Sequence, residues 1–180
     1  MRRSFLKLAM APAALGLFSL TGCVSEGRYA ELERAYQQLQ SQYSADQATI
    51  QMLEGRLKVT MTDRILFPSG GFRINESARR ELGKMVPTLR GLTQTRVIIE
   101  GYTDTMPVGP ELRREGIASN LDLSSRRADT VADTLIALGA PRNIISADGR
   151  GEANPVASNA TPEGRARNRR IEVTLAGPGT

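Results

Sequence analysis

Apolar residues between positions 58 and 176 follow two different periods in turn, and this alternation constrains the fold more than any other feature. A strand points every second side chain to one face, whereas a helix repeats about every 3.6 residues. The strand-like stretches are 59–67, 97–99, 145–149 and 171–175, and the helical stripes are 76–89 and 124–138. Strands that alternate with helices predict an α/β sandwich in which helices pack on one mixed sheet. We therefore expect one domain at 58–176, followed by a short tail at 177–180.

Local signals mark the expected helix ends. Asn75 and Ser124 are expected to cap the two helices, because their side chains accept hydrogen bonds from free backbone N–H groups. Pro87 is expected to kink or end the first helix early, since proline lacks the N–H that continues a helix. Between Asp104 and Leu121 we expect a long loop.

The first 22 residues have the pattern of a secretory signal. A basic start is followed by an apolar stretch that is too short and too interrupted by Pro12 and Gly16 to form a stable spanning helix. The segment ends at Cys23, the only cysteine. Leu20-Thr21-Gly22-Cys23 resembles a bacterial lipoprotein lipobox, which implies cleavage before Cys23 and its acylation. The alternative is a chance cysteine at the end of an uncleaved anchor.

Composition excludes several classes of function. The formal charge is +5, but three of the positive side chains lie in the predicted signal, which leaves about +2. Without tryptophan, and with few aromatic residues, nucleic acid is not an expected partner. The chain has no histidine, so Ser-His and Cys-His nucleophiles and histidine-bound metals are excluded. With its lone cysteine acylated, the chain could form no internal disulfide. We expect no metal site, no cofactor and no enzymatic activity.

A heptad-like pattern follows a short junction at 23–28. Apolar or aromatic residues recur in steps of three and four, with one slot filled by Asp46, at Tyr29, Leu32, Tyr36, Leu39, Tyr43, Ile50, Leu53 and Leu57. The pattern predicts a helical spacer over 29–57, about 43 Å long at about 1.5 Å per residue. Its apolar seam would drive a coiled coil, either between copies of the chain or with a partner helix. Alternatively, it is a single amphipathic helix that docks on something else or is partly disordered.

Two charged residues are the strongest site candidates. Asp104 follows a buried strand, at the sheet edge where open α/β sheets place ligands. Arg127 shares the buried row of its helix with Val131 and Leu135, close to the helix start. A cation near a helix N-terminus is disfavoured by the helix dipole. Arg127 therefore needs a carboxylate, from either the protein or a ligand.

These residues belong to a series of motifs that resembles the C-terminal peptidoglycan-binding domain of the OmpA-like family. In chain order the motifs are Gly101-Tyr102-Thr103-Asp104, 120–128, 149–155, Asn159, Gly164-Arg165 and 168–173. The stretch 120–128 is most similar to the flagellar stator B branch. The lipobox instead resembles the peptidoglycan-associated lipoproteins of the outer membrane.

The resemblance implies non-covalent binding of the diaminopimelate residue in the peptide stem of peptidoglycan. Asp104 would hold its ammonium and Arg127 its carboxylate. The supporting residues are Thr103, Asn120, Leu123, Ser124 and Arg169. The alternative is an internal Asp104–Arg127 ion pair without a ligand. The segment 106–119 is either a lid or a solvated insertion.

Together these features predict an outer-membrane lipoprotein that faces the periplasm and tethers the membrane to the cell wall. A second possibility is an adaptor, in which the helix at 29–57 recruits a transport or motility machine and the domain serves as its anchor.

Overall fold

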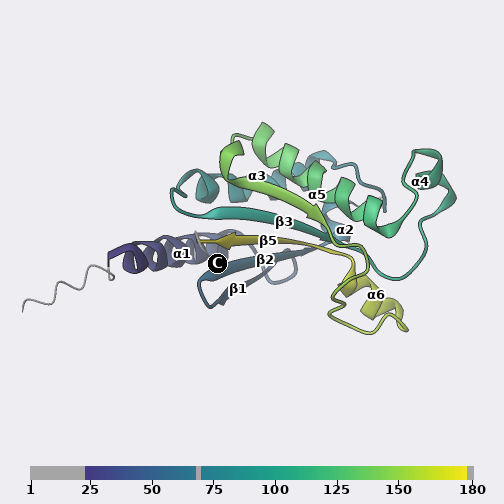
Figure 1. Ribbon diagram of the computed structural model, residues 1–180, viewed down its shortest axis with the longest axis horizontal. Helices are drawn as coiled ribbons and strands as arrows, with labels where there is room; N and C mark the ends of the chain where they lie inside the picture. The colour runs from purple at the N-terminus through teal and green to yellow at the C-terminus, as the bar shows by residue number, and fades with distance from the viewer. Residues whose placement is uncertain (1–22, 68–69, 178–180) are drawn as a thin grey trace, which may run out of the picture.

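One five-stranded mixed sheet organises the chain (Figure 1). The computed structural model describes residues 23–67 and 70–177, so the predicted signal peptide lies outside the described residues. The strands are β1 Thr49–Leu53, β2 Arg56–Thr62, β3 Arg96–Tyr102, β4 Ile145–Gly149 and β5 Arg170–Ala176. Their order is β1-β2-β5-β3-β4, with β5 in the centre. Only β3 and β4 pair in parallel, because a helix connects them across the sheet.

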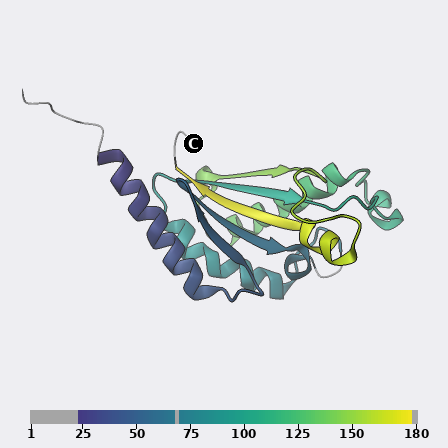
Figure 2. The ribbon, with the colours of Figure 1, turned by 90° about the horizontal axis from the view of Figure 1, so that it is seen from below.

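The helices divide between the sheet face and the loops. They are α1 Cys23–Gln42, α2 Asp63–Leu66, α3 Glu76–Arg90, α4 Pro110–Arg114, α5 Asn120–Ala137 and α6 Pro162–Asn168, with a 3₁₀ turn at Arg142–Ile144. α3 and α5 lie on one face of the sheet, and α1 lies beside α3 and β1 (Figure 2). None of the described helices combines the length and apolarity needed to span a membrane.

The core lies between this sheet face and the helices. Alternate residues of β2 and β5 point into it, and they are Leu57, Val59, Met61, Ile171, Val173 and Leu175. The opposite surfaces come from α3 and α5, where Leu82, Leu89 and Leu135 are completely buried. Each such side chain stabilises the fold by about 1.5–3 kcal/mol. The predicted α/β sandwich on a mixed sheet is therefore confirmed.

Two predictions about α3 had different outcomes. Asn75 caps the helix as expected, and its side chain accepts a hydrogen bond from the Ala78 N–H. Of the two effects expected of Pro87, the early end was wrong, because α3 continues to Arg90, and the kink stays a prediction. Burial of Met85 and Leu89 on either side of the proline holds the last turn against the sheet and offsets the missing hydrogen bond.

The start of α5 also differs from the prediction. Ser119, not Ser124, is the N-cap, and it forms a reciprocal capping box with Asp122. The expected loop up to Leu121 is therefore shorter and contains α4. Ser124 lies one turn inside α5, where its hydroxyl donates to the Leu121 carbonyl and accepts from the Gly151 N–H.

The strand expected at 59–67 ends at Thr62, and Asp63 begins the short helix α2. Leu66 and Phe67 remain buried in this new conformation. Over a stretch of only a few residues, apolar side chains spaced two apart are compatible with either a strand or a short helix. The spacing alone therefore did not locate the end of the strand.

The predicted helical spacer at 29–57 was wrong in length and in its surroundings. α1 ends at Gln42, and residues 49–62 form the β1–β2 hairpin, which turns at Gly55 with a φ of 67°. Leu32 and Leu39 are buried in the domain core and are not available as a coiled-coil seam. α1 is therefore the single amphipathic helix of the second alternative, and the surface on which it docks belongs to its own domain. The predicted boundary between 57 and 58 therefore does not separate two units.

Candidate functional site

A cavity of about 450 Å³ opens at the end of β3, between α2, α6 and the start of α5. Its charged lining comprises two acids and four arginines, which are Asp63, Asp104, Arg64, Arg127, Arg165 and Arg169. The excess of arginines makes the cavity electropositive and suits a ligand with more carboxylates than amines.

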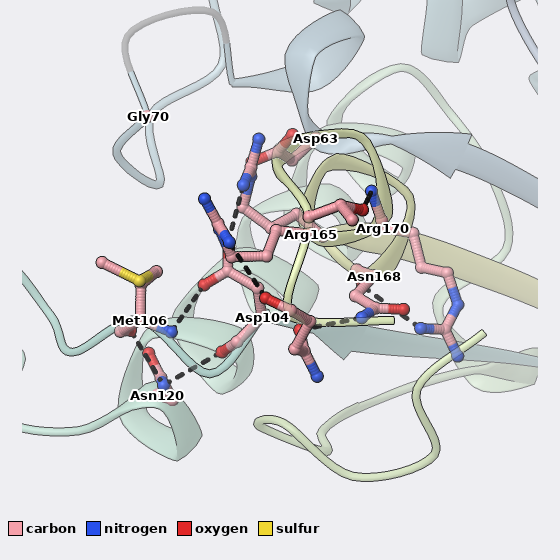
Figure 3. A network of polar contacts seen from close by, with 12 residues as sticks. Asp63, Gly70, Asp104, Met106, Asn120, Arg165, Asn168 and Arg170 are labelled. Atoms are coloured by element: carbon pink, nitrogen blue, oxygen red, sulfur yellow. Dashed lines mark hydrogen bonds and ion pairs between the residues drawn. The ribbon is translucent and has the colours of Figure 1, made fainter. Parts of the chain in front are cut away.

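Asp104 is fixed just beyond β3 and is only 5% exposed. One carboxylate oxygen accepts the Met106 N–H at 2.9 Å, and the other accepts Arg169 Nη1 at 2.6 Å. Asn120 holds the same turn, because its side-chain amide donates to the backbone carbonyls of Asp104 and Met106 (Figure 3). Each carboxylate oxygen has a second lone pair, so Asp104 can accept a further donor.

Arg127 lies on the buried side of α5 and is 2% exposed. Its Nε and Nη2 donate to the carbonyls of Gly71 and Gly70, at 2.8 and 2.7 Å. Its Nη1 lies 3.6 Å from Asp63 Oδ2 and has no hydrogen-bond partner among the described residues. Burial lowers the pKa of Arg127, against the opposing effect of Asp63. Arg127 thus lines the cavity and carries a buried donor, Nη1, which pairs with Asp63 in charge but makes no hydrogen bond among the described residues.

Asp63 is a site residue that the sequence reasoning missed. It is the first residue of α2 and lines the cavity, and its Oδ2 lies 3.0 Å from Arg169 Nε and 3.6 Å from Arg127 Nη1. Burial raises the pKa of Asp63, although both arginines oppose the shift. An acidic residue at the end of a strand was the available signal, but the apparent continuation of the strand concealed it.

The four charges alternate in sign. Arg169 links the two acids, and Arg127 faces Asp63 rather than Asp104. The internal ion pair between Asp104 and Arg127, considered as an alternative to ligand binding, is absent among the described contacts. Both residues line the cavity, and each is held by other partners.

The other predicted site residues divide into two groups. Thr103, Asn120, Leu123 and Arg169 line the cavity together with Asp104 and Arg127. The Thr103 hydroxyl is buried and has no described hydrogen-bond partner. Ser124 does not line the cavity, because its hydroxyl is used in packing α5 on the loop after β4.

Two glycines allow α5 to start close to the sheet. A Cβ at Gly101 would collide with the backbone carbonyl of Ser124, and one at Gly149 would collide with Ser125. The first turns of α5 therefore rest directly on the ends of β3 and β4. This close approach places Arg127 beside the end of β3.

Arg170 and Arg165 make different contacts from Arg169. Arg170 is buried, pairs with Glu172 at 2.7 Å and stacks on the Tyr102 ring at 3.8 Å. It has a structural role on the other face of the sheet. Arg165 lines the cavity and donates to the Asn159 carbonyl.

Most residues of the segment 106–119 are exposed, but a few apolar side chains tie it to the domain. Val108, Ile117 and Leu123 are buried in a small cluster that also contacts Phe72 and Leu112. Val108, Gly109 and Leu112 form one wall of the cavity. The residues that the structure describes include no group of acidic or cysteine side chains placed to hold a metal ion.

This fold and this charged cavity define an α/β sandwich domain with a polar site at one end of its sheet. The chain matches the OmpA family over residues 66–169, and it belongs to that family.

Three relatives place this similarity in context. Peptidoglycan-binding protein ArfA of Mycobacterium tuberculosis H37Rv is 37% identical over 123 residues, which is 68% of this chain and 35% of ArfA. Putative lipoprotein YfiB of Escherichia coli K12 is 29% identical over 175 residues, covering 96% of this chain and 99% of YfiB. The structure of the cell wall anchor of the T6SS from Pseudomonas aeruginosa is similar with a TM-score of 0.71 and 33% identity, covering 80% and 97% of the two chains. This chain thus spans about a third of ArfA and nearly all of YfiB.

Proposed function

We propose that this protein is a lipid-anchored module that binds the diaminopimelate-containing stem of peptidoglycan and tethers the outer membrane to the cell wall. One observation carries the proposal: Arg127 lines the same cavity as Asp104, and its buried Nη1, 3.6 Å from Asp63 Oδ2, has no hydrogen-bond partner among the described residues. A buried donor without a partner costs about 1–3 kcal/mol, and a bound acceptor would remove that cost.

The chemistry of the ligand matches the two groups. The free end of diaminopimelate carries an ammonium and a carboxylate on one carbon. Asp104 accepts the ammonium in a charge-assisted hydrogen bond, and Arg127 Nη1 donates to the carboxylate. The Thr103 hydroxyl, also buried without a partner, offers a third polar contact nearby. The additional arginines of the lining favour the other carboxylates of the stem.

The names of the relatives support the same function. ArfA is described as peptidoglycan-binding, YfiB as a putative lipoprotein, and the Pseudomonas structure as a cell wall anchor. A non-covalent binding module, rather than an enzyme, is the function that these similarities favour at the level of the family.

The proposed lipid at Cys23 would hold the domain close to the membrane. α1 begins at Cys23, and Leu32 is already buried in the core. Nine helical residues span about 14 Å, far less than a free helix over 29–57 would span. The wall would therefore be bound close to the membrane surface. The adaptor alternative loses its main support, because the seam that would recruit a partner is buried.

The test is a pulldown with purified sacculi. Asp104→Asn and Arg127→Lys are each expected to weaken binding at least tenfold, roughly the effect of one lost charge-assisted hydrogen bond. Asp129→Asn and Arg80→Ala are matched controls, because both residues are exposed and lie outside the cavity. Thermal unfolding must show that each variant is folded. Wild-type retention by folded Asp104→Asn and Arg127→Lys would refute the site.

A further inference from the structure

A second cavity of about 610 Å³ adjoins the first. Gly70, Gly109 and Leu112 line both cavities, so the two lie side by side. Two of these three shared residues are glycines, so little side-chain bulk stands at the boundary between the cavities. A ligand longer than one amino acid can therefore extend from the first cavity into the second.

The second cavity differs from the first in its charge. Its charged side chains are Arg73, Arg114, Glu111 and Glu115, two of each sign. The first cavity, by contrast, has four arginines against two acids. A balanced set of donors and acceptors suits a neutral group with many hydroxyls and amides better than it suits an anion.

Phe72 contributes an aromatic surface to this cavity. The ring is half-buried against Leu112 and the small apolar cluster around it. The Arg73 and Arg126 guanidinium groups lie 5.0 and 5.9 Å from its centre. An aromatic ring beside planar charged groups offers a sugar ring both an apolar contact and hydrogen bonds.

An exposed ion pair lies in the lining of the second cavity. Arg73 Nη2 lies 2.7 Å from Glu115 Oε2, and the two side chains are 74% and 36% exposed. Exposed pairs of this kind contribute little to stability. Both side chains can therefore turn toward a ligand at small cost, while Arg114 and Glu111 have no described side-chain hydrogen bond to give up.

From these observations we infer that the second cavity binds the N-acetylated sugar to which the peptide stem is attached. The inference rests on the proposed function, because it requires the stem to occupy the first cavity. From diaminopimelate the stem runs one way through two amino acids to a neutral sugar of the glycan. In the other direction it runs to a small D-alanine with a carboxylate. The neutral, aromatic second cavity matches the sugar end.

The experiment compares ligands of increasing length on the full chain in detergent solution, by isothermal titration calorimetry. The probes are the L-Ala-γ-D-Glu-diaminopimelate tripeptide, the same tripeptide with a terminal D-alanine, and the tripeptide attached to the disaccharide. We expect the disaccharide to tighten binding about tenfold, the equivalent of one or two net hydrogen bonds. Arg73→Ala/Arg114→Ala should abolish this gain and leave tripeptide affinity unchanged.

The control is Arg80→Ala/Arg167→Ala, which removes two exposed arginines that line neither cavity. It should retain the full gain. If the tripeptide binds but the disaccharide adds nothing, the inference is wrong and the proposed function stands. If the gain comes from D-alanine instead, the direction assigned to the stem is wrong. Failure of every probe to bind wild type would overturn the proposed function itself.

Discussion

Asp104 accepts a hydrogen bond from Arg169, which is 65 residues further along the chain, at 2.6 Å. This pairing fixes the carboxylate at the cavity wall without involving Arg127. The second acid, Asp63, faces both Arg169 and Arg127 and so joins the two sides of the site. A ligand that carries both charges can then contact Asp104 and Arg127 without breaking an ion pair between them.

Asp63 is expected to stabilise the site by compensating Arg127. Asp63→Ala should lower the free energy of unfolding by about 3–5 kcal/mol, because it leaves a buried guanidinium without its carboxylate. Urea unfolding followed by circular dichroism measures the loss. The double variant Asp63→Ala/Arg127→Met should recover part of it, since no buried charge then remains unpaired. Equal losses in the single and double variants would contradict this coupling.

Leu39 tests whether α1 belongs to the domain. Leu39→Ala should lower the free energy of unfolding of the whole domain by about 2–5 kcal/mol, because the side chain is fully buried in the common core. The exposed neighbour Gln40 provides the control, and Gln40→Ala should change stability little. A free coiled-coil helix would give the opposite pattern, in which Leu39→Ala alters the oligomeric state and leaves domain unfolding unchanged.

Glu172 should make stability depend on pH in the acid range. Burial alone would raise its pKa, but hydrogen bonds from Lys58 and Arg170 hold the pKa below the ordinary value of 4.5. A carboxyl with a depressed pKa in the folded state stabilises the protein above the unfolded value, and this contribution is lost as pH falls through the folded value. Wild type should therefore lose stability when the pH falls from 5 to about 3.

The matched measurement uses Glu172→Gln, which keeps the shape of the side chain and removes its titration. The difference between its unfolding free energies at pH 5 and at about pH 3 should be smaller than in wild type. Other carboxyls titrate equally in both proteins and cancel in the comparison. An identical pH dependence in the two proteins would show that Glu172 has no depressed pKa.

The sequence predicted the helices and strands best where burial imposes a long, regular pattern. The period of 76–89 indicated a helix, and the alternation at 171–175 indicated a strand, because each face of these elements meets a different environment. The prediction from the sequence was wrong where a helix and a hairpin share the same spacing of apolar residues. Over residues 29–57 the same three- and four-residue steps ran through a helix, a turn and a hairpin, and only the docking of α1 on α3 distinguishes them.

The sequence by itself also indicated Asp104 and Arg127, since an acid after a buried strand and a cation on a buried helix row are both anomalies that need an explanation. Tertiary structure alone decided which charges face one another. Asp63, Asp104, Arg127 and Arg169 come from four separate segments, and their pairing depends on the order of the strands and on how closely α5 approaches the sheet. Coulomb interactions depend on distances in space, and those distances exist only once the chain has folded.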